Sequence, residues 1–469
     1  MLSFFRINDP YRLIFVLLLL VLVRLPFYIW GIPLTLPELH WRLIGEAMAQ
    51  GGHLYLDIWD DIGPLSGVMY QAIFYLFGDS RWPYYVISAL LVIIQAGLFN
   101  QVLLRNKAYK ENTYVPALFY MMYMNLSFDF ITLPPILFSI TFILLAINNI
   151  FRRIDNNTRD ELFLYTGLYL GIAVLFYLPL LPFLFTTALS LALFTGSIPR
   201  RYILLFFGFS VLISVSYAYY YWFDAVDEFH TQFMKGLWRT RKHYLMSSFQ
   251  LLVIGGSSLL ILVVSLFRIY TKARFANYQV KFQQVMFINI IAGFITLAIS
   301  NQIVPQLLLI FVPPLAFFTA HYILEMRRRI WAEIFTTLVF VLVLGWSYAM
   351  FKLPARLSET ITYDAYFAQK ELLPASYSGK KIWVIGDKES YYESAVLGSK
   401  YLNWNLSEEE VTQLDFYSNV ENVFNNIDQI QPEVIVDLEG LMPKLINRAP
   451  AIGERYESVE GTNLYIRRE

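Results

Sequence analysis

Long apolar runs, separated by short polar segments, fill the first three quarters of the chain. Several of these runs reach the ~20 residues that an α-helix needs to cross a bilayer. The pattern predicts an all-α polytopic membrane protein with about 11 spans. The expected spans are residues 12–31, 83–104, 113–126, 134–151, 162–178, 179–197, 202–222, 247–267, 283–299, 304–324 and 331–351.

The pattern changes after residue 354, where the apolar density falls. Short apolar runs at 380–386 and 432–438 are typical of buried strands, and helical patterning lies between them. Residues 456–468 predict a hairpin that turns at Glu460 and Gly461. We therefore expect a helical membrane domain at 1–354 and a small α/β domain at 355–469.

The basic residues indicate which loops share one side of the membrane. Lys and Arg favour cytoplasmic loops, and the clusters fall on one side only if residues 64–78 do not cross. Residues 64–78 are also short for a span, so we expect an interfacial helix within an outer loop at 32–82. This threading predicts a multi-pass protein of the inner membrane with a cytoplasmic N-terminus and an extracytoplasmic C-terminal domain.

The composition of the chain argues against several classes of function. Lys+Arg and Asp+Glu are both 36, so no charge excess suggests a nucleic-acid partner, and the lack of cysteine excludes disulfides and a thiol nucleophile. The expected spans hold almost no ionisable residue apart from Arg24, which disfavours an ion-coupled transporter.

Several cations are candidates for binding a lipid phosphate. Arg24 lies near the outer end of the first span, where a charged residue suggests function. Arg239, Arg241 and Lys242 lie in an outer loop, on the side where positive charge is scarce, and guanidinium groups match phosphate geometry. The alternative is a solvated loop whose cations are balanced by nearby acids.

The outer loop at 32–82 combines acids, aromatic residues and predicted helix ends in a specific order. It contains Glu38, a helix to Gly51, Tyr55-Leu56-Asp57, Trp59-Asp60, Pro64-Leu65 and Leu76-Phe77-Gly78. In order and spacing this loop resembles the first extracytoplasmic loop of the GT-C superfamily of membrane glycosyltransferases. The nearest relatives by this resemblance are bacterial protein mannosyltransferase-like proteins and the lipid A aminoarabinose transferases.

The resemblance implies a glycosyltransferase that takes a sugar from a polyprenyl-phosphate-linked donor at the outer face of the membrane. It makes Glu38 the best candidate for a catalytic base, with Asp57, Asp60 and, in a second outer loop, Asp129 in support. Trp59 is a candidate for stacking on sugar, with interfacial placement as the alternative. His40 is a further candidate for substrate binding, and two of His40, His53, His230 and His243 with an acid could hold a divalent metal.

Departures from the family pattern keep a second function open. Only one acid, Glu38, stands where relatives commonly have two, and Ile62-Gly63 replaces a common Lys. In the second loop Leu133 stands at the usual place of an Asp. The alternative is a catalytically inactive GT-C-like scaffold in a cell-surface assembly complex, with protein partners docking on residues 355–469. Helix capping is the structural alternative for these acids, especially Asp61.

Overall fold

A computed structural model describes residues 1–155, 160–196, 198–239, 245–272, 275–352, 366–369 and 373–468. Residue contacts divide the chain into two compact units. The first, here called the helical unit, comprises Met1–Ile32, Arg81–Ala218 and Tyr244–Tyr363. The second, here called the loop–sheet unit, comprises Pro33–Ser80, Tyr219–His243 and Asp364–Glu469. The expected division at residue 354 stays a prediction, because residues 353–365 lie outside the described residues.

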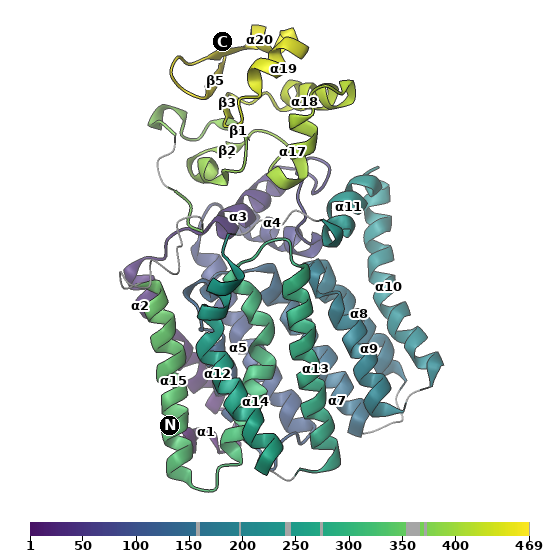
Figure 1. The fold of residues 1–469 in the computed structure, drawn as a ribbon, viewed down its shortest axis with the longest axis vertical. Helices are drawn as coiled ribbons and strands as arrows, with labels where there is room; N and C mark the ends of the chain where they lie inside the picture. Colours follow the sequence, from purple (N-terminus) through teal and green to yellow (C-terminus); the bar gives the residue numbers. More distant parts are fainter. Residues whose placement is uncertain are drawn as a thin grey trace. The chain divides into compact units, whose positions relative to one another are not determined.

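Within the described residues, nine helices are long and apolar enough to cross a membrane. They run side by side in Figure 1 and make the chain a multi-pass membrane protein. They are α2 (Arg12–Trp30), α5 (Trp82–Arg105), α7 (Pro135–Asp155), α9 (Pro182–Thr195, extended by η2 at Leu178–Leu180), α10 (Pro199–Trp222), α12 (Ser248–Lys272), α13 (Asn277–Ile299), α14 (Val312–Leu324, preceded by η4 at Pro305–Phe311) and α15 (Arg329–Phe351).

Two further predicted spans coincide with shorter helices. Helix α8 (Glu161–Phe176) has 16 residues, and α6 (Val115–Tyr123) has nine. Every residue of α6 is buried, and the helix packs against α5 and α14. At ~1.5 Å per residue, α6 is too short to cross a bilayer, and its apolar character reflects protein packing.

Helices α8 and α10 approach each other at the level of their backbones. A Cβ atom on Gly167 of α8 would lie 2.0 Å from the carbonyl oxygen of Leu205 on α10. A Cβ atom on Gly208 of α10 would lie 2.4 Å from the carbonyl oxygen of Leu164. The crossing therefore requires glycine on both helices, as in other membrane helix pairs with small residues at their contact.

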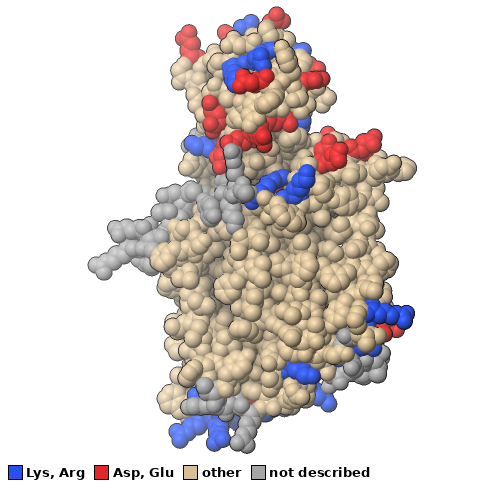
Figure 2. Space-filling view, turned by 45° about the vertical axis from the view of Figure 1, so that its right-hand side comes forward, with Lys and Arg blue, Asp and Glu red and all other residues tan. Residues whose placement is uncertain are grey.

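Basic residues gather at one end of the helical unit, beyond a broad uncharged band (Figure 2). Lys110, after α5, forms an ion pair of 2.8 Å with Glu325 at the end of α14. Arg6, after α1 (Leu2–Phe5), donates to the carbonyl oxygen of Ile323 at 3.4 Å. Arg201 of α10 pairs at 2.7 Å with Asp160 before α8. Near the start of α13, Gln279 donates to the Lys107 carbonyl at 3.2 Å and Lys281 to the Phe194 carbonyl at 3.1 Å. Together these contacts place the loops that carry most of the basic residues at the same end of the unit.

The loop–sheet unit contains a five-stranded sheet in the order β2-β1-β3-β5-β4. Strand β1 pairs in parallel with β2 and β3, while β5 is antiparallel to β3 and β4. The predicted strands and the C-terminal hairpin are confirmed. The strands are β1 (Lys381–Ile385), β2 (Val396–Leu397), β3 (Val434–Asp437), β4 (Tyr456–Ser458) and β5 (Leu464–Arg467). The accompanying helices are η5 (Ala375–Tyr377), η6 (Glu389–Ser394), α17 (Trp404–Thr412), α18 (Tyr417–Ile430), α19 (Met442–Arg448) and α20 (Pro450–Arg455).

Two helices from the outer loop, α3 (Leu36–Ala49) and α4 (Pro64–Phe77), belong to the same unit. The Thr35 hydroxyl accepts the backbone N–H of Glu38 at 3.3 Å and caps α3. Helix α4 begins at its proline and ends before Gly78, whose φ is 62°. The helix expected at 64–78 therefore forms, and its interfacial position stays a prediction. The unit is completed by α11 (Val226–Gln232) and η3 (Met234–Trp238).

Candidate functional site

A buried histidine lies between two carboxylates in the loop–sheet unit. His40 projects from α3, and its Nε2 atom lies 2.7 Å from Oδ2 of Asp60. Its Nδ1 atom lies 2.9 Å from Oε1 of Glu389, at the start of η6. His40 is 7% exposed and Asp60 is 1% exposed. Three distant parts of the sequence thus meet at one imidazole ring, and we call this group the acid–histidine cluster.

The two acids decide the protonation state of His40. Burial by itself would lower the pKa of this imidazole, but the charges of Glu389 and Asp60 and their hydrogen bonds outweigh burial. The pKa of His40 therefore lies well above its ordinary value. At neutral pH the ring is a cation that donates one hydrogen bond to each carboxylate.

Protein donors surround the Asp60 carboxylate. Its Oδ1 atom accepts the backbone N–H of Ile62 at 2.7 Å, and Oδ2 also lies 3.4 Å from Nδ2 of Asn403. The backbone N–H of Asp60 donates to the side chain of Gln232 at 3.1 Å. The Gln232 amide in turn donates to the Tyr55 carbonyl at 2.8 Å. Asp60 therefore fixes the conformation of the loop that carries it.

The same loop has an uncommon backbone at Tyr55. This buried residue has a φ of 75°, in a region that residues with a side chain seldom adopt. Its hydroxyl donates to the carbonyl oxygen of Ile62 at 2.6 Å and closes the loop. A strained residue that its surroundings hold in place is typical of functional loops.

Trp59 packs against the sheet. Its backbone N–H donates to the Lys400 carbonyl at 2.8 Å, and its ring meets Tyr401 edge-on with centroids 5.3 Å apart. The Lys400 ammonium lies 4.6 Å from the indole centroid. The ring joins the hydrophobic core around Trp383. Stacking of Trp59 on a sugar stays a prediction beside these protein contacts.

The remaining predicted residues of this unit occupy different environments. Glu38 is fully buried in the first turn of α3. Asp57 is exposed and accepts the backbone N–H of His53 at 2.8 Å. Arg239 donates to the carbonyl oxygen of Thr231 at 2.9 Å, and its Nη1 atom lies 3.9 Å from Asp61. Arg241, Lys242 and His243 lie outside the described residues.

Two predicted residues belong to the helical unit. Arg24 is 1% exposed, and its guanidinium donates to Asn125 Oδ1 at 3.0 Å, to Ser88 Oγ at 3.2 Å and to the carbonyl of Phe130 at 3.4 Å. Asp129 is fully buried in η1 (Phe128–Ile131), next to the carbonyl that Arg24 binds. The structure thus brings Arg24 to the connection between α6 and α7.

Among the residues that the structure describes, no group of three His, Asp or Glu side chains is arranged to hold a metal ion. Both ring nitrogens of His40 face carboxylates, so this histidine has no lone pair for a metal.

Sequence reasoning missed Glu389, Asn403 and Gln232, which complete the acid–histidine cluster. The position of Glu389 in the predicted sheet could have indicated its role. It follows the carboxyl end of β1, a strand paired in parallel with its neighbours, where functional side chains of α/β sheets concentrate. Nothing in the spacing links it to His40, 349 residues earlier.

No protein-family model matches this sequence, and no curated protein matches it. Among solved structures, the chain is similar to ArnT from Cupriavidus metallidurans bound to undecaprenyl phosphate. The two share 12% identity over 96% of this chain and 97% of ArnT, with a TM-score of 0.56. The Archaeoglobus fulgidus oligosaccharyltransferase, in complex with Zn and sulfate, gives 14% identity over 95% and 71% of the two chains and a TM-score of 0.45. The likeness to ArnT extends over nearly the whole of both chains, so the chain has the fold of ArnT.

Proposed function

We propose that this protein transfers a sugar from a polyprenyl-phosphate-linked donor to an acceptor. The observation that carries the proposal is the fold likeness to ArnT over nearly the whole of both chains, because that ArnT structure holds undecaprenyl phosphate. A multi-pass membrane protein suits a donor whose hydrocarbon tail stays in the bilayer.

The reaction needs a base and a stabilised leaving group. The acceptor oxygen or nitrogen forms a bond to the sugar C1 atom while the bond from C1 to the phosphate oxygen breaks. The polyprenyl phosphate leaves with that electron pair, and the acceptor proton goes to a carboxylate. We assign this base to Glu38, a buried acid in the first turn of α3.

The acid–histidine cluster gives Asp60 a different role from that of Glu38. Asp60 already accepts hydrogen bonds from His40, Ile62 and Asn403, so we assign it to positioning the loop rather than to proton transfer. Asp57 and Asp129 stay supporting candidates on sequence grounds.

Arg24 and Arg239 are the described cations that we propose for the leaving phosphate, and Arg241 and Lys242 are candidates on sequence grounds. Cations stabilise the charge that develops on the leaving group. The basic loops at one end of the helical unit favour a cytoplasmic position for that end. The proposed reaction then takes place at the outer face of an inner membrane, with the C-terminal domain on the same side.

One observation favours a second function, that of a GT-C-like scaffold without activity. The hydrogen bonds that occupy His40 and Asp60 are those of a structural network, and they leave neither group available for chemistry. In a scaffold the C-terminal domain would dock protein partners, and Glu38 would serve only to start α3.

A complementation experiment distinguishes the two functions. The gene is deleted, then restored as wild type, Glu38→Gln or the matched control Glu46→Gln, a partly buried acid on the same helix. Protein levels are equalised, and surface glycans and lipid-linked sugars are profiled by mass spectrometry. The enzyme proposal expects a glycan that wild type and Glu46→Gln restore and Glu38→Gln does not. Full restoration by Glu38→Gln refutes Glu38 as the base and favours the scaffold.

A further inference from the structure

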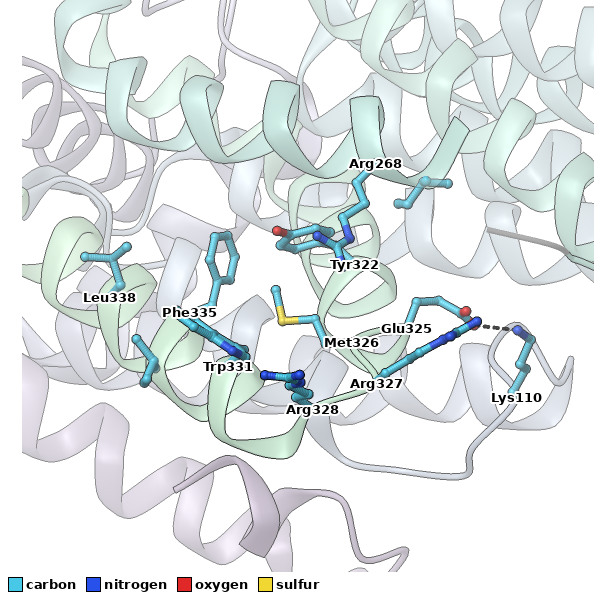
Figure 3. A pocket seen from close by; sticks show the side chains of 12 residues that line it. Lys110, Arg268, Tyr322, Glu325, Met326, Arg327, Arg328, Trp331, Phe335 and Leu338 are labelled. Atoms are coloured by element: carbon cyan, nitrogen blue, oxygen red, sulfur yellow. Dashed lines mark ion pairs between the residues drawn. The ribbon is translucent and has the colours of Figure 1, made fainter. Parts of the chain in front are cut away.

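A cleft opens at the basic end of the helical unit, between the ends of α12, α14 and α15. Its volume is about 1210 Å³, which exceeds the pockets that usually hold small ligands. Figure 3 shows side chains from these helices and from the segment after α5 around it. None of the residues proposed above for sugar transfer lines this cleft.

Three arginines give the cleft a positive charge. Arg268 comes from α12, and Arg327 and Arg328 come from the turn between α14 and α15. Within the described part of the chain, none of the three forms an ion pair with a carboxylate. The acid in the lining, Glu325, is paired with Lys110 at 2.8 Å, so these two charges cancel. The cleft therefore carries an excess of about three positive charges that face solvent.

One wall of the cleft is apolar. Trp331, Ile334, Phe335 and Leu338 follow one face of α15 at helical spacing. Trp331 is 60% exposed, Ile334 51% and Leu338 49%. At ~1.5 Å per residue these side chains extend about 10 Å along a membrane-spanning helix, starting from a tryptophan at its polar end.

We propose that this cleft binds an anionic diacyl phospholipid. The head-group phosphate lies between Arg268, Arg327 and Arg328, and the acyl chains lie along the exposed side chains of α15. Basic pockets between membrane helices recognise acidic lipid head groups. A soluble phosphate would use the same arginines, but it would leave the apolar wall without a role.

This site is distinct from the proposed donor site. The N-terminal segment lies at the same end as the cleft, because Arg6 binds the Ile323 carbonyl. Arg24 lies 12 residues beyond the start of α2 at Arg12, which is about 18 Å along the helix. The phospholipid therefore binds at the other end of the helical unit from Arg24, and it serves as a bound lipid rather than a sugar donor.

Native mass spectrometry of the purified full-length protein in detergent tests the proposal. The probes are phosphatidylglycerol, phosphatidylcholine and soluble glycerol 3-phosphate. The test variant combines Arg268→Gln, Arg327→Gln and Arg328→Gln. The control combines Arg105→Gln, Arg152→Gln and Arg200→Gln, which removes the same charge from exposed positions at the same end. We expect the test variant to weaken phosphatidylglycerol binding at least about ten-fold, and the control to leave it within about two-fold.

Three results would overturn the proposal. The control variant could weaken binding as much as the test variant, which would indicate a general charge effect. Phosphatidylcholine could bind as tightly as phosphatidylglycerol to the wild type. Glycerol 3-phosphate could displace the lipid completely, and the double variant Ile334→Asn/Leu338→Asn could bind lipid as well as the wild type. These two results together would identify a site for soluble phosphate. The proposal expects this last variant to weaken lipid binding and to leave the thermal stability near that of wild type.

Discussion

His40 and Asp60 are joined by a buried hydrogen bond of 2.7 Å, and His40 joins Glu389 through its other ring nitrogen at 2.9 Å. One protonated ring thus ties α3 to the loop before α4 and to the segment after β1. The same segments also meet through the backbone N–H of Trp59, which donates to the Lys400 carbonyl, and through Asn403, whose side chain lies 3.4 Å from Asp60.

Removing the ring should destabilise the loop–sheet unit. His40→Ala leaves Asp60 buried without its cationic partner, which typically costs 3–5 kcal/mol. We expect about 3 kcal/mol here, because Glu389 keeps 23% exposure and can be solvated. The midpoint of thermal unfolding of the purified protein measures the loss. His53→Ala is the matched control, since His53 and Asp57 form an exposed pair that contributes at most ~1 kcal/mol. Equal effects of both variants would contradict the structural role of His40.

The free energy of unfolding should fall as the pH rises, because the His40 ring loses its proton. The folded-state pKa of His40 is raised well above the unfolded value of about 6.5. A raised pKa contributes stability that is fully present below pH ~6.5 and is lost as pH rises through the folded-state pKa. Unfolding midpoints measured across this range should fall for the wild type and stay flatter for His40→Ala. Parallel curves for the two proteins would show that His40 is not the group responsible.

The crossing of α8 and α10 should not tolerate a side chain at Gly167. A Cβ atom there would lie 2.0 Å from the Leu205 carbonyl oxygen, so Gly167→Val must push the helices apart. We expect a loss of about 3 kcal/mol, at the upper end of overpacking effects, measured as a shift in thermal unfolding. Gly256→Ala in α12 is the control, because its Cβ atom would meet nothing within 4 Å. That variant should be neutral or stabilising by less than about 1 kcal/mol.

Arg24 should not be replaceable by lysine. Its guanidinium donates from three nitrogens to Asn125, Ser88 and Phe130, whereas an ammonium group is a compact donor that cannot span this arrangement. Arg24→Lys should lower stability by about 1–3 kcal/mol through unpaired buried acceptors. If Arg24 also binds the donor phosphate, the variant should bind undecaprenyl phosphate more weakly in native mass spectrometry. Unchanged stability would mean that water or a neighbour replaces these hydrogen bonds.

Local features of the fold could be predicted because their causes are local. The helix at 64–78 is bounded by a proline and a glycine, and the strand at 381–385 is a short apolar run with polar flanks. Residues 113–126 illustrate the limit, since hydrophobicity alone does not distinguish a spanning helix from a short helix buried in protein. The expected segment is shorter than the ~20 residues of a span, and this length argues against a crossing of the membrane.

The candidate site depended on contacts across the chain. Asp60 could be selected because it stands in the outer loop that carries the family resemblance, and His40 because it is a histidine of the same loop. Their pairing with Glu389 results from how the sheet packs, and no periodicity encodes it. The balance of burial against two carboxylates, which sets the charge on His40, is likewise a property of the folded unit.

Helix α14 with η4 has almost no surface left for lipid, since 89% of its most apolar window is buried inside the protein. Its insertion into a bilayer therefore exposes residues such as Thr319 and His321 to hydrocarbon until neighbouring helices surround them. Its main neighbours, α6 and α12, both precede α14 in the chain and are therefore synthesised first. Biogenesis of this protein therefore requires α14 to enter the bilayer against α6 and α12, so the helices made earlier act as the surface that receives it.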